Sequence, residues 1–191
     1  MEKRENMKIH LLGPCGSGTS TLGRLIARKY GYTWFDSDDF YWYKTDPPYT
    51  KKREMDDRVN LLHSTLGKHD SWVLSGSVLN WGNELRNVFD IVVYLYVEQE
   101  ERIRRLEKRE RENYGTRIDS GNDMGEIHKA LIDYSKQYET GGMDIRSRMS
   151  ELEWLKEAKG EIIRLEGSLT IEEKMEIVAK EIDKGNHRAT A

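Results

Sequence analysis

The feature that most constrains the fold of this chain is a glycine-rich stretch, GPCGSGTST, at residues 13–21. It follows a short apolar run at 8–12 and precedes a segment, 20–30, whose leucine and isoleucine spacing is typical of a helix. A strand, a glycine loop and a helix in this order aim backbone N–H groups and the positive end of the helix at a phosphate. The stretch matches the phosphate-binding pattern G-x-x-x-x-G-K-[ST] except at Thr19, which stands where the lysine is expected.

We therefore expect this loop to bind ATP. Glycines let the backbone approach phosphate oxygens without a Cβ in the way, and Ser20 is placed to ligate Mg²⁺. A glycine-rich turn without a ligand is the alternative, but the conformational entropy that glycines lose on folding weighs against it. The residues expected to bind the nucleotide are Gly13, Gly16, Ser17, Gly18, Thr19, Ser20 and Thr21.

Apolar, β-branched runs alternate with helical patterns along the rest of the chain. Strands are expected at 32–35, 72–75, 90–97 and 161–165, and helices at about 51–67, 98–113, 127–138, 149–158 and from 170 onward. We expect the acidic stretch 36–39 to be a turn and 114–123 to be a loop. The alternation predicts an α/β fold in which helices cover both faces of a five-stranded parallel sheet.

Length and composition fit one domain, 1–191. The formal net charge is −3 and the calculated pI is about 6.0, which makes general attraction to nucleic acid unfavourable. No run of 18 apolar residues and no apolar leader is present, so we expect no membrane span and a cytoplasmic protein. The single cysteine, Cys15, rules out an intrachain disulfide. The oligomeric state does not follow from the sequence.

The chain resembles P-loop kinases of the adenylate, cytidylate and shikimate kinase type. Archaeal-type cytidylate kinases carry a similar GSGTT loop, with threonine in place of lysine. The strings GPCGSGTSTLGRLIA, YWYKTDPPYTKKR, WVLSGS and RSRMSELEWL also resemble a bacterial group of small kinase-like ATPases, described as adenylate-kinase-related or topology modulation proteins. The resemblance covers nearly the whole chain and does not fix the substrate. It implies the ATP-binding three-layer sandwich of P-loop NTPases, with a helical lid at about 110–145 and an acceptor-binding insertion at about 40–68.

A lysine-less loop needs another cation, since a charge about 4 Å from a phosphate oxygen contributes roughly 4 kcal/mol at an effective dielectric constant of 20. In the helix at 98–113, helical spacing puts Arg102, Arg105 and Arg109 on one face. The resemblance implies that Arg105 and Arg109 begin a lid, and that Arg146 and Arg148 lie where related kinases keep another phosphate-binding arginine. We expect Arg105, Arg109, Arg146 and Arg148 to be catalytic, with Arg117 as a further option. Ion pairing with the many nearby glutamates is the alternative.

The acceptor is expected at the carboxyl end of the second strand, where Asp36 and Asp38 lie. Their spacing resembles the D-x-D of shikimate kinases, which implies contact with the acceptor and support of the Mg²⁺ water shell. Ser75 stands where the third strand would usually end in an aspartate, so Asp36 or Asp38 is expected to take over that role. Arg53 and Arg58, close to several aromatic residues, suit a flat anionic acceptor. Turn chemistry or a helix N-cap for the aspartates, and core packing for the aromatic rings, are the alternatives.

The sequence thus predicts an enzyme, an ATP- and Mg²⁺-dependent kinase that transfers the γ-phosphoryl group to a small acceptor. A nucleoside monophosphate is slightly favoured over a hydroxyl compound of the shikimate or gluconate type. The alternative is a nucleotide-binding regulator, with or without a DNA partner, that has little kinase activity.

Overall fold

The computed structural model describes residues 6–167 and 169–188 and contains a five-stranded parallel sheet of order β2-β3-β1-β4-β5. The strands are β1 Lys8–Leu12, β2 Thr33–Asp36, β3 Trp72–Ser75, β4 Ile91–Leu95 and β5 Glu161–Leu165. The helices are α1 Thr19–Tyr30, α2 Ser37–Tyr41, α3 Met55–Leu66, α4 Gln99–Tyr114, α5 Gly125–Lys136, α6 Arg148–Glu157 and α7 Ile171–Arg188, with 3₁₀ turns η1 Glu84–Asn87 and η2 Gly115–Ile118.

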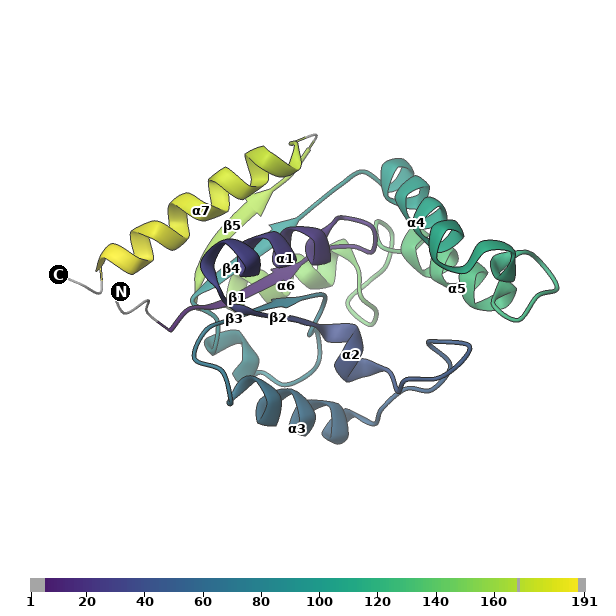
Figure 1. Cartoon of the computed structure of the whole chain (residues 1–191), viewed down its shortest axis with the longest axis horizontal. Coiled ribbons are helices and arrows are strands. Elements are labelled where there is room, and N and C mark those ends of the chain that lie inside the picture. Colours follow the sequence, from purple (N-terminus) through teal and green to yellow (C-terminus); the bar gives the residue numbers. More distant parts are fainter. Residues whose placement is uncertain (1–5, 168, 189–191) are drawn as a thin grey trace.

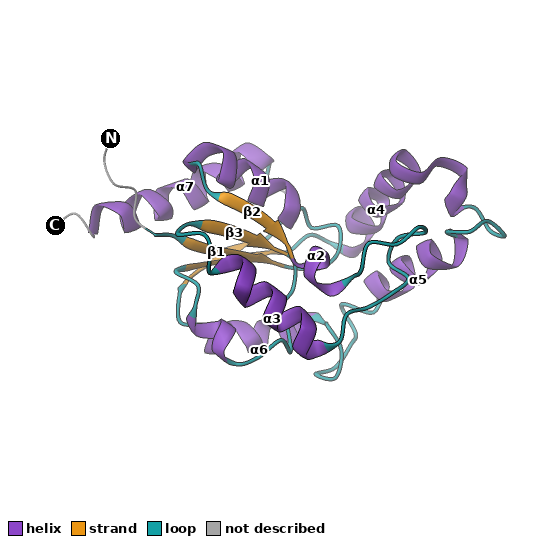
Figure 2. Ribbon diagram, turned by 60° about the horizontal axis from the view of Figure 1, so that its bottom comes forward, coloured by secondary structure: helices purple, strands orange, loops and turns teal. Residues whose placement is uncertain are grey.

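Helices cover both faces of the sheet, as Figures 1 and 2 show, with α1 and α7 on one side and α3 and α6 on the other. Strand residues alternate between the two layers. In β4, Ile91 and Val93 pack toward α1 and α7, whereas Val92 and Tyr94 pack toward α3 and α6. Burial on both faces explains why this strand is apolar throughout, and it confirms the predicted three-layer fold.

Local sequence signals fix several helix ends. Gly31 ends α1 in the left-handed conformation, with φ 73°. The predicted capping box before α7 is present, because Thr170 and Glu173 exchange backbone-to-side-chain hydrogen bonds of 2.7 and 3.2 Å. Ser147 and Ser150 form a comparable reciprocal cap before α6. These caps satisfy N–H groups that the first helical turn leaves free.

Three predicted boundaries were wrong. The acidic stretch 36–39 is largely helical, because the Asp36 side chain accepts a hydrogen bond from the Asp38 N–H and starts the short helix α2. The helix expected from about 51 begins only at Met55, after an isolated bridge between Trp42 and Lys52 that extends the chain here. The expected loop at 114–123 contains the 3₁₀ turn η2.

The helices α4 and α5 lie together and project away from the sheet (Figure 1), at the carboxyl end of the strands. Within the described ranges, no helix has the length and hydropathy needed to cross a membrane.

Candidate functional site

The glycine loop lies between β1 and α1 at the carboxyl edge of the sheet. At Gly13, whose φ is 149°, an added Cβ would lie 2.0 Å from the Leu95 carbonyl oxygen at the end of β4. A side chain at this position would push the loop away from the strand, so the approach requires glycine.

The loop offers donors for an anion. Gly18 is the N-cap of α1 and supplies no side-chain cap, so the N–H groups of the first turn lack intrahelical acceptors. The Ser17 hydroxyl is buried and has no hydrogen-bond partner within the described part of the chain. An orphaned buried hydroxyl beside uncapped amides, at the positive end of a helix, fits a phosphate group.

The Ser20 hydroxyl donates to Asp36 Oδ2 at 2.8 Å, which joins the start of α1 to the end of β2. A hydroxyl and a carboxylate side by side next to a phosphate loop suit Mg²⁺, which commonly takes one or two protein ligands and completes its shell with phosphates and water. Across residues 6–167 and 169–188, no group of three or more His, Cys, Asp or Glu side chains could hold a metal ion without ligands from a bound molecule.

Ser75, at the position expected for an aspartate, has a structural role. Its hydroxyl donates to the Thr19 carbonyl at 3.1 Å and accepts from Trp34 Nε1 at 3.0 Å. These contacts tie the start of α1 to β2 and β3. They leave Asp36 as the carboxylate that contacts Ser20.

A guanidinium group occupies the glycine loop. Arg146, between α5 and α6, donates from Nη2 to the Gly13 carbonyl, and its Nη1 lies 3.9 Å from Cys15 Sγ. Its Nε donates to Glu151 Oε1 at 2.8 Å, and the Glu151 side chain is fully buried. Burial alone would lower the pKa of Arg146, but the Glu151 carboxylate raises it, so the group stays charged.

Asp38 lies in the same region. Desolvation of the carboxylate by the surrounding protein and repulsion from Asp36 raise the pKa of Asp38 to about 6, although Arg146 and Arg109 oppose this shift. The side chain nevertheless remains exposed to solvent. A carboxylate that is accessible and close to two guanidinium groups can orient a hydroxyl group and accept its proton.

The predicted arginines do not converge on one point. Arg109, on α4, pairs with the buried Glu110 at 2.8 Å and is close enough to Asp38 to lower its pKa. Arg105, one turn earlier, bonds Glu101 at 2.7 Å on the exposed surface. Arg148 lies 4.3 Å from the centre of the Tyr96 ring and is partly exposed. Of the four arginines, Arg146 contacts the loop directly, and Arg109 is near enough to Asp38, in α2, to interact with it electrostatically.

Arg102, expected on the same helix face as Arg105 and Arg109, is fully buried, whereas those two arginines are partly exposed. Its guanidinium donates to Val97 O at 2.9 Å, to Ser135 Oγ at 2.8 Å and to Glu139 Oε1 at 2.7 Å. It also reaches the Cys15 carbonyl of the glycine loop at 3.4 Å. Arg102 therefore joins the projecting helices to the loop.

The two arginines predicted for the acceptor differ in their surroundings. Arg53 donates from Nη1 to the backbone carbonyls of Asp39 and Trp42 at the end of α2, so the protein uses one of its two terminal nitrogens. The Arg58 guanidinium forms no hydrogen bond with the described residues and lies 4.4 Å from the Tyr41 ring centre and 5.4 Å from that of Trp81. Its guanidinium is therefore the freer of the two.

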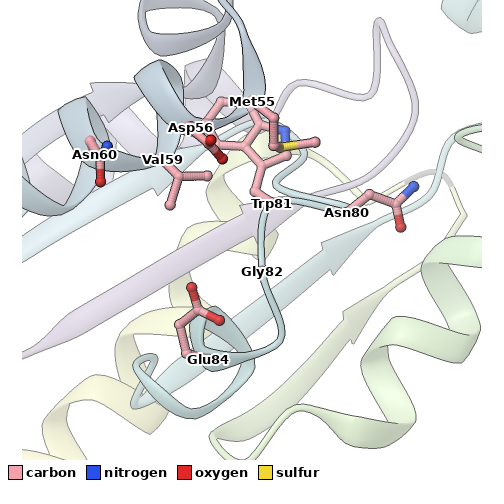
Figure 3. A pocket seen from close by; sticks show the side chains of 8 residues that line it. All are labelled: Met55, Asp56, Val59, Asn60, Asn80, Trp81, Gly82 and Glu84. Carbon is pink, nitrogen blue, oxygen red and sulfur yellow. The ribbon is translucent and has the colours of Figure 1, made fainter.

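A pocket of about 460 Å³ opens between α3 and the loop after β3 (Figure 3). Trp81 forms part of its wall, next to Met55 and Val59 of α3, and Asp56 and Glu84 give the wall an acidic character. No residue of the glycine loop lines this pocket. It adjoins the Arg58 region through Trp81 and is separate from the phosphate loop.

The segment before α3 also contacts the projecting helices. Arg117, in η2, pairs with Asp46 at 2.7 Å as well as with Asp123. Burial and the neighbouring Tyr114 hydroxyl raise the pKa of Tyr49. The segment before α3 and the end of α4 with η2, which are distant in sequence, thus meet near Asp38.

Two features of the site gave no clear signal in the sequence. Glu151 is one of many glutamates, and its role follows only from its burial next to Arg146. Tyr138 fits the apolar stripe of its helical pattern, yet its hydroxyl donates to Glu151 Oε2 at 2.7 Å. The RSRMSELEWL string contains both Arg146 and Glu151, and their common presence there is the nearest signal.

The strand order, the glycine loop and the carboxylates at the sheet edge define a small P-loop kinase-like protein. The chain belongs to the AAA domain family, whose family model matches residues 9–129.

The chain is also similar to individual proteins. It is 35% identical to the uncharacterized protein YqaC of Bacillus subtilis (strain 168) over 89% of this chain and 94% of that protein. Among solved structures, a gluconokinase from Sinorhizobium meliloti 1021 covers 98% of each chain at 16% identity and a TM-score of 0.55. A shikimate kinase from Acinetobacter baumannii, in complex with shikimate, covers 94% of each chain at 18% identity and a TM-score of 0.55. At these identities the two structures support the kinase fold alone.

Proposed function

We propose that this protein is an ATP-dependent kinase that transfers the γ-phosphoryl group of ATP to a hydroxyl group of a small acceptor. The observation that carries the proposal is the hydrogen bond of Ser20 with Asp36 at the phosphate loop, with Asp38 and Arg109 close enough to interact electrostatically. Phosphoryl transfer needs positioning and charge neutralisation more than covalent chemistry, and this arrangement supplies both.

In the proposed reaction, the loop amides from Gly18 onward and the Ser17 hydroxyl hold the donor phosphates. Ser20 and Asp36 would hold Mg²⁺, which supplies charge neutralisation at the phosphate oxygens when bound. The acceptor oxygen forms a bond to the γ-phosphorus as the bond to the bridging oxygen breaks, and that oxygen keeps the electron pair in ADP. Asp38 takes the acceptor proton, and Arg146 and Arg109 offset the negative charge.

The surroundings of the acidic turn favour a hydroxyl acceptor over the nucleoside monophosphate that the sequence alone slightly favours. An acceptor phosphate carrying about −1.5 to −2 charges would be repelled by Asp36 and Asp38 at the point of transfer. A hydroxyl instead benefits from the carboxylate of Asp38. Arg58 is available to bind a carboxylate elsewhere on the acceptor.

The names of the structural neighbours support the same choice. Gluconokinase and shikimate kinase are named for acceptors that carry hydroxyl and carboxylate groups and no phosphate. By analogy, a small hydroxy acid is the acceptor class that we propose first for this chain.

The direct test is a screen for acceptor-dependent ADP release with four groups of compounds: hydroxy acids, sugars, nucleosides and nucleoside monophosphates. We expect a hydroxy acid to stimulate ADP release and Asp38→Asn to reduce that turnover by about 100-fold or more, in line with loss of a general base. Stimulation by nucleoside monophosphates alone would replace the hydroxyl proposal. ATP binding without acceptor-dependent turnover would favour the regulatory alternative.

Two arginines of α4 give a matched pair for the same assay. We expect Arg109→Ala to lower turnover by about 10-fold or more, because its charge is near Asp38. Arg105→Ala should change turnover less than twofold, because the guanidinium pairs with Glu101 on the exposed surface. Equal effects of the two changes would remove Arg109 from the proposed catalytic group.

A further inference from the structure

The guanidinium of Arg146, which lies at the phosphate loop, is held in place by other side chains. Thr19 carries no charge, and among the described residues the guanidinium groups that donate to carbonyls of the loop are those of Arg146, at Gly13, and Arg102, at Cys15. Arg102 is fully buried and engaged by Glu139, whereas the Arg146 side chain keeps 19% of its exposure. Arg146 is thus the cation that has access to a ligand in the loop.

Only part of the Arg146 guanidinium is used by the protein. A guanidinium has five N–H groups, and here the Nε–H bonds Glu151 and one Nη2–H bonds Gly13. Within the described residues, the others meet only the Cys15 sulfur, a weak acceptor, at 3.9 Å. Donors left over in a nearly buried group beside uncapped helix amides point to an anionic ligand.

Glu151 holds this guanidinium through a chain of buried hydrogen bonds. Its Oε1 accepts from Arg146 Nε at 2.8 Å and its Oε2 accepts from the Tyr138 hydroxyl at 2.7 Å. The Tyr138 hydroxyl is in turn 2.9 Å from that of Tyr94. Burial and the Glu151 charge raise the pKa of Tyr138, so its hydroxyl stays protonated. With both oxygens engaged, the carboxylate has one orientation, and it fixes that of Arg146.

The backbone adds rigidity to the pair. Arg146 and Glu151 flank the reciprocal cap between Ser147 and Ser150, and the Arg148 N–H donates to the Tyr138 carbonyl at 2.8 Å. The segment that carries the cation is therefore held to the end of α5 and to the start of α6 together.

We propose that Glu151 is a positioning residue: with Tyr138 it holds the guanidinium of Arg146 in the glycine loop, where Arg146 supplies the positive charge that a lysine at position 19 would supply. The inference rests on the proposed ATP binding at this loop. It concerns the affinity for ATP, so it does not depend on the identity of the acceptor or on turnover.

The test is calorimetric titration of the full chain with MgATP in two backgrounds, the native one and Thr19→Lys. In the native background we expect Arg146→Met and Glu151→Gln each to weaken binding about 10- to 100-fold, as loss of a charge-assisted interaction predicts. In the Thr19→Lys background both changes should have less than about a threefold effect, because the charge no longer depends on Arg146. A residue that merely stabilises the fold would cost the same affinity in both backgrounds, which would overturn the proposal.

Tyr138→Phe guards against a variant that fails to fold, because it removes a single oxygen atom and keeps the ring. Its smaller loss of affinity in the native background should also disappear with Thr19→Lys, and unchanged affinity for both Glu151→Gln and Tyr138→Phe would refute the role of the network. Thr19→Glu is the control for position 19, since it adds a side chain of opposite charge and should not compensate. A native protein that does not bind MgATP would refute the proposed function itself, whereas MgATP binding without turnover leaves this test intact.

Discussion

Replacing Arg102 by methionine should destabilise the protein substantially, because this side chain of α4 is fully buried and makes several hydrogen bonds. The guanidinium is charged, so its bonds to Val97 O at 2.9 Å and Ser135 Oγ at 2.8 Å contribute about 1.5 kcal/mol each. The bond to Glu139 at 2.7 Å joins two charged groups, but Glu139 can turn toward water, which limits its loss to about 1 kcal/mol. The expected total is about 4 kcal/mol in the free energy of unfolding, within the range for breaking a buried ion pair.

The neighbouring Arg104 provides the control, since it also pairs with a glutamate, in this case Glu101 of its own helix. Its bond to Glu101 is 2.8 Å long, but 66% of its side chain is exposed. A pair of this kind contributes about 0.2–0.5 kcal/mol, so Arg104→Met should have little effect. The two changes thus separate burial from pairing.

The assay is urea denaturation followed by circular dichroism, with linear extrapolation to water and comparison of the midpoints at equal slope. A loss below about 1 kcal/mol for Arg102→Met, or an equal loss for the two variants, would refute the reasoning that burial makes this arginine structural. A changed slope with an unchanged midpoint for Arg102→Met would mean that α4 and α5 unfold separately from the sheet, which is also contrary to the expectation.

Three further outcomes are expected. Gly13→Ala should abolish ATP binding in calorimetry, because its Cβ would lie 2.0 Å from a carbonyl oxygen. Gly18→Ala should weaken binding only about 10-fold, because no atom lies within 4 Å of the added Cβ and the cost comes from the φ of 97° alone. A larger loss for Gly18→Ala than for Gly13→Ala would contradict the loop geometry. The acceptor kcat/KM should fall as the pH drops through about 6, because the raised pKa leaves Asp38 protonated below that value; a profile flat to pH 5 would exclude Asp38 as the base. Arg117→Gln removes the exposed ion pair between η2 and Asp46, in the segment before α3. It should raise the acceptor KM two- to fivefold, or about 0.5–1 kcal/mol, with little change in melting temperature; an unchanged KM would show that this contact does not assist acceptor binding.

The fold and the phosphate loop could be predicted from sequence because both depend on local patterns. The apolar run of β4 and the helical spacing after Gly18 specify their elements without tertiary information. The glycine loop follows from residue type and spacing alone. Boundaries near α2 could not be predicted, because this five-residue helix depends on a single Asp36 cap and on its position at the sheet edge.

The roles of individual arginines could not be predicted in the same way. The helical pattern places Arg102 with Arg105 and Arg109, yet the docking of α5 buries Arg102, and a glutamate one turn away engages Arg105. Arg53 lies among aromatic residues in the sequence, but the carbonyl groups that it contacts belong to the end of α2, a helix that the sequence pattern did not indicate. A long charged side chain has several partners within reach, and only tertiary packing selects one.

Placing the loop cation on a distant segment has a thermodynamic consequence. A lysine at position 19 would be covalently part of the loop, so its charge would lie there without further support. Arg146 comes from another segment and must be held at the loop by Glu151 and by the cap that begins α6. If phosphate binding requires this segment to be docked, then by linkage phosphate must stabilise the docked segment by the same free energy. Amide hydrogen exchange around residues 141–151 should therefore slow when MgATP binds, and more than in Thr19→Lys, where the charge no longer depends on docking. Equal slowing in the two proteins would mean that ATP orders this segment through contacts other than Arg146.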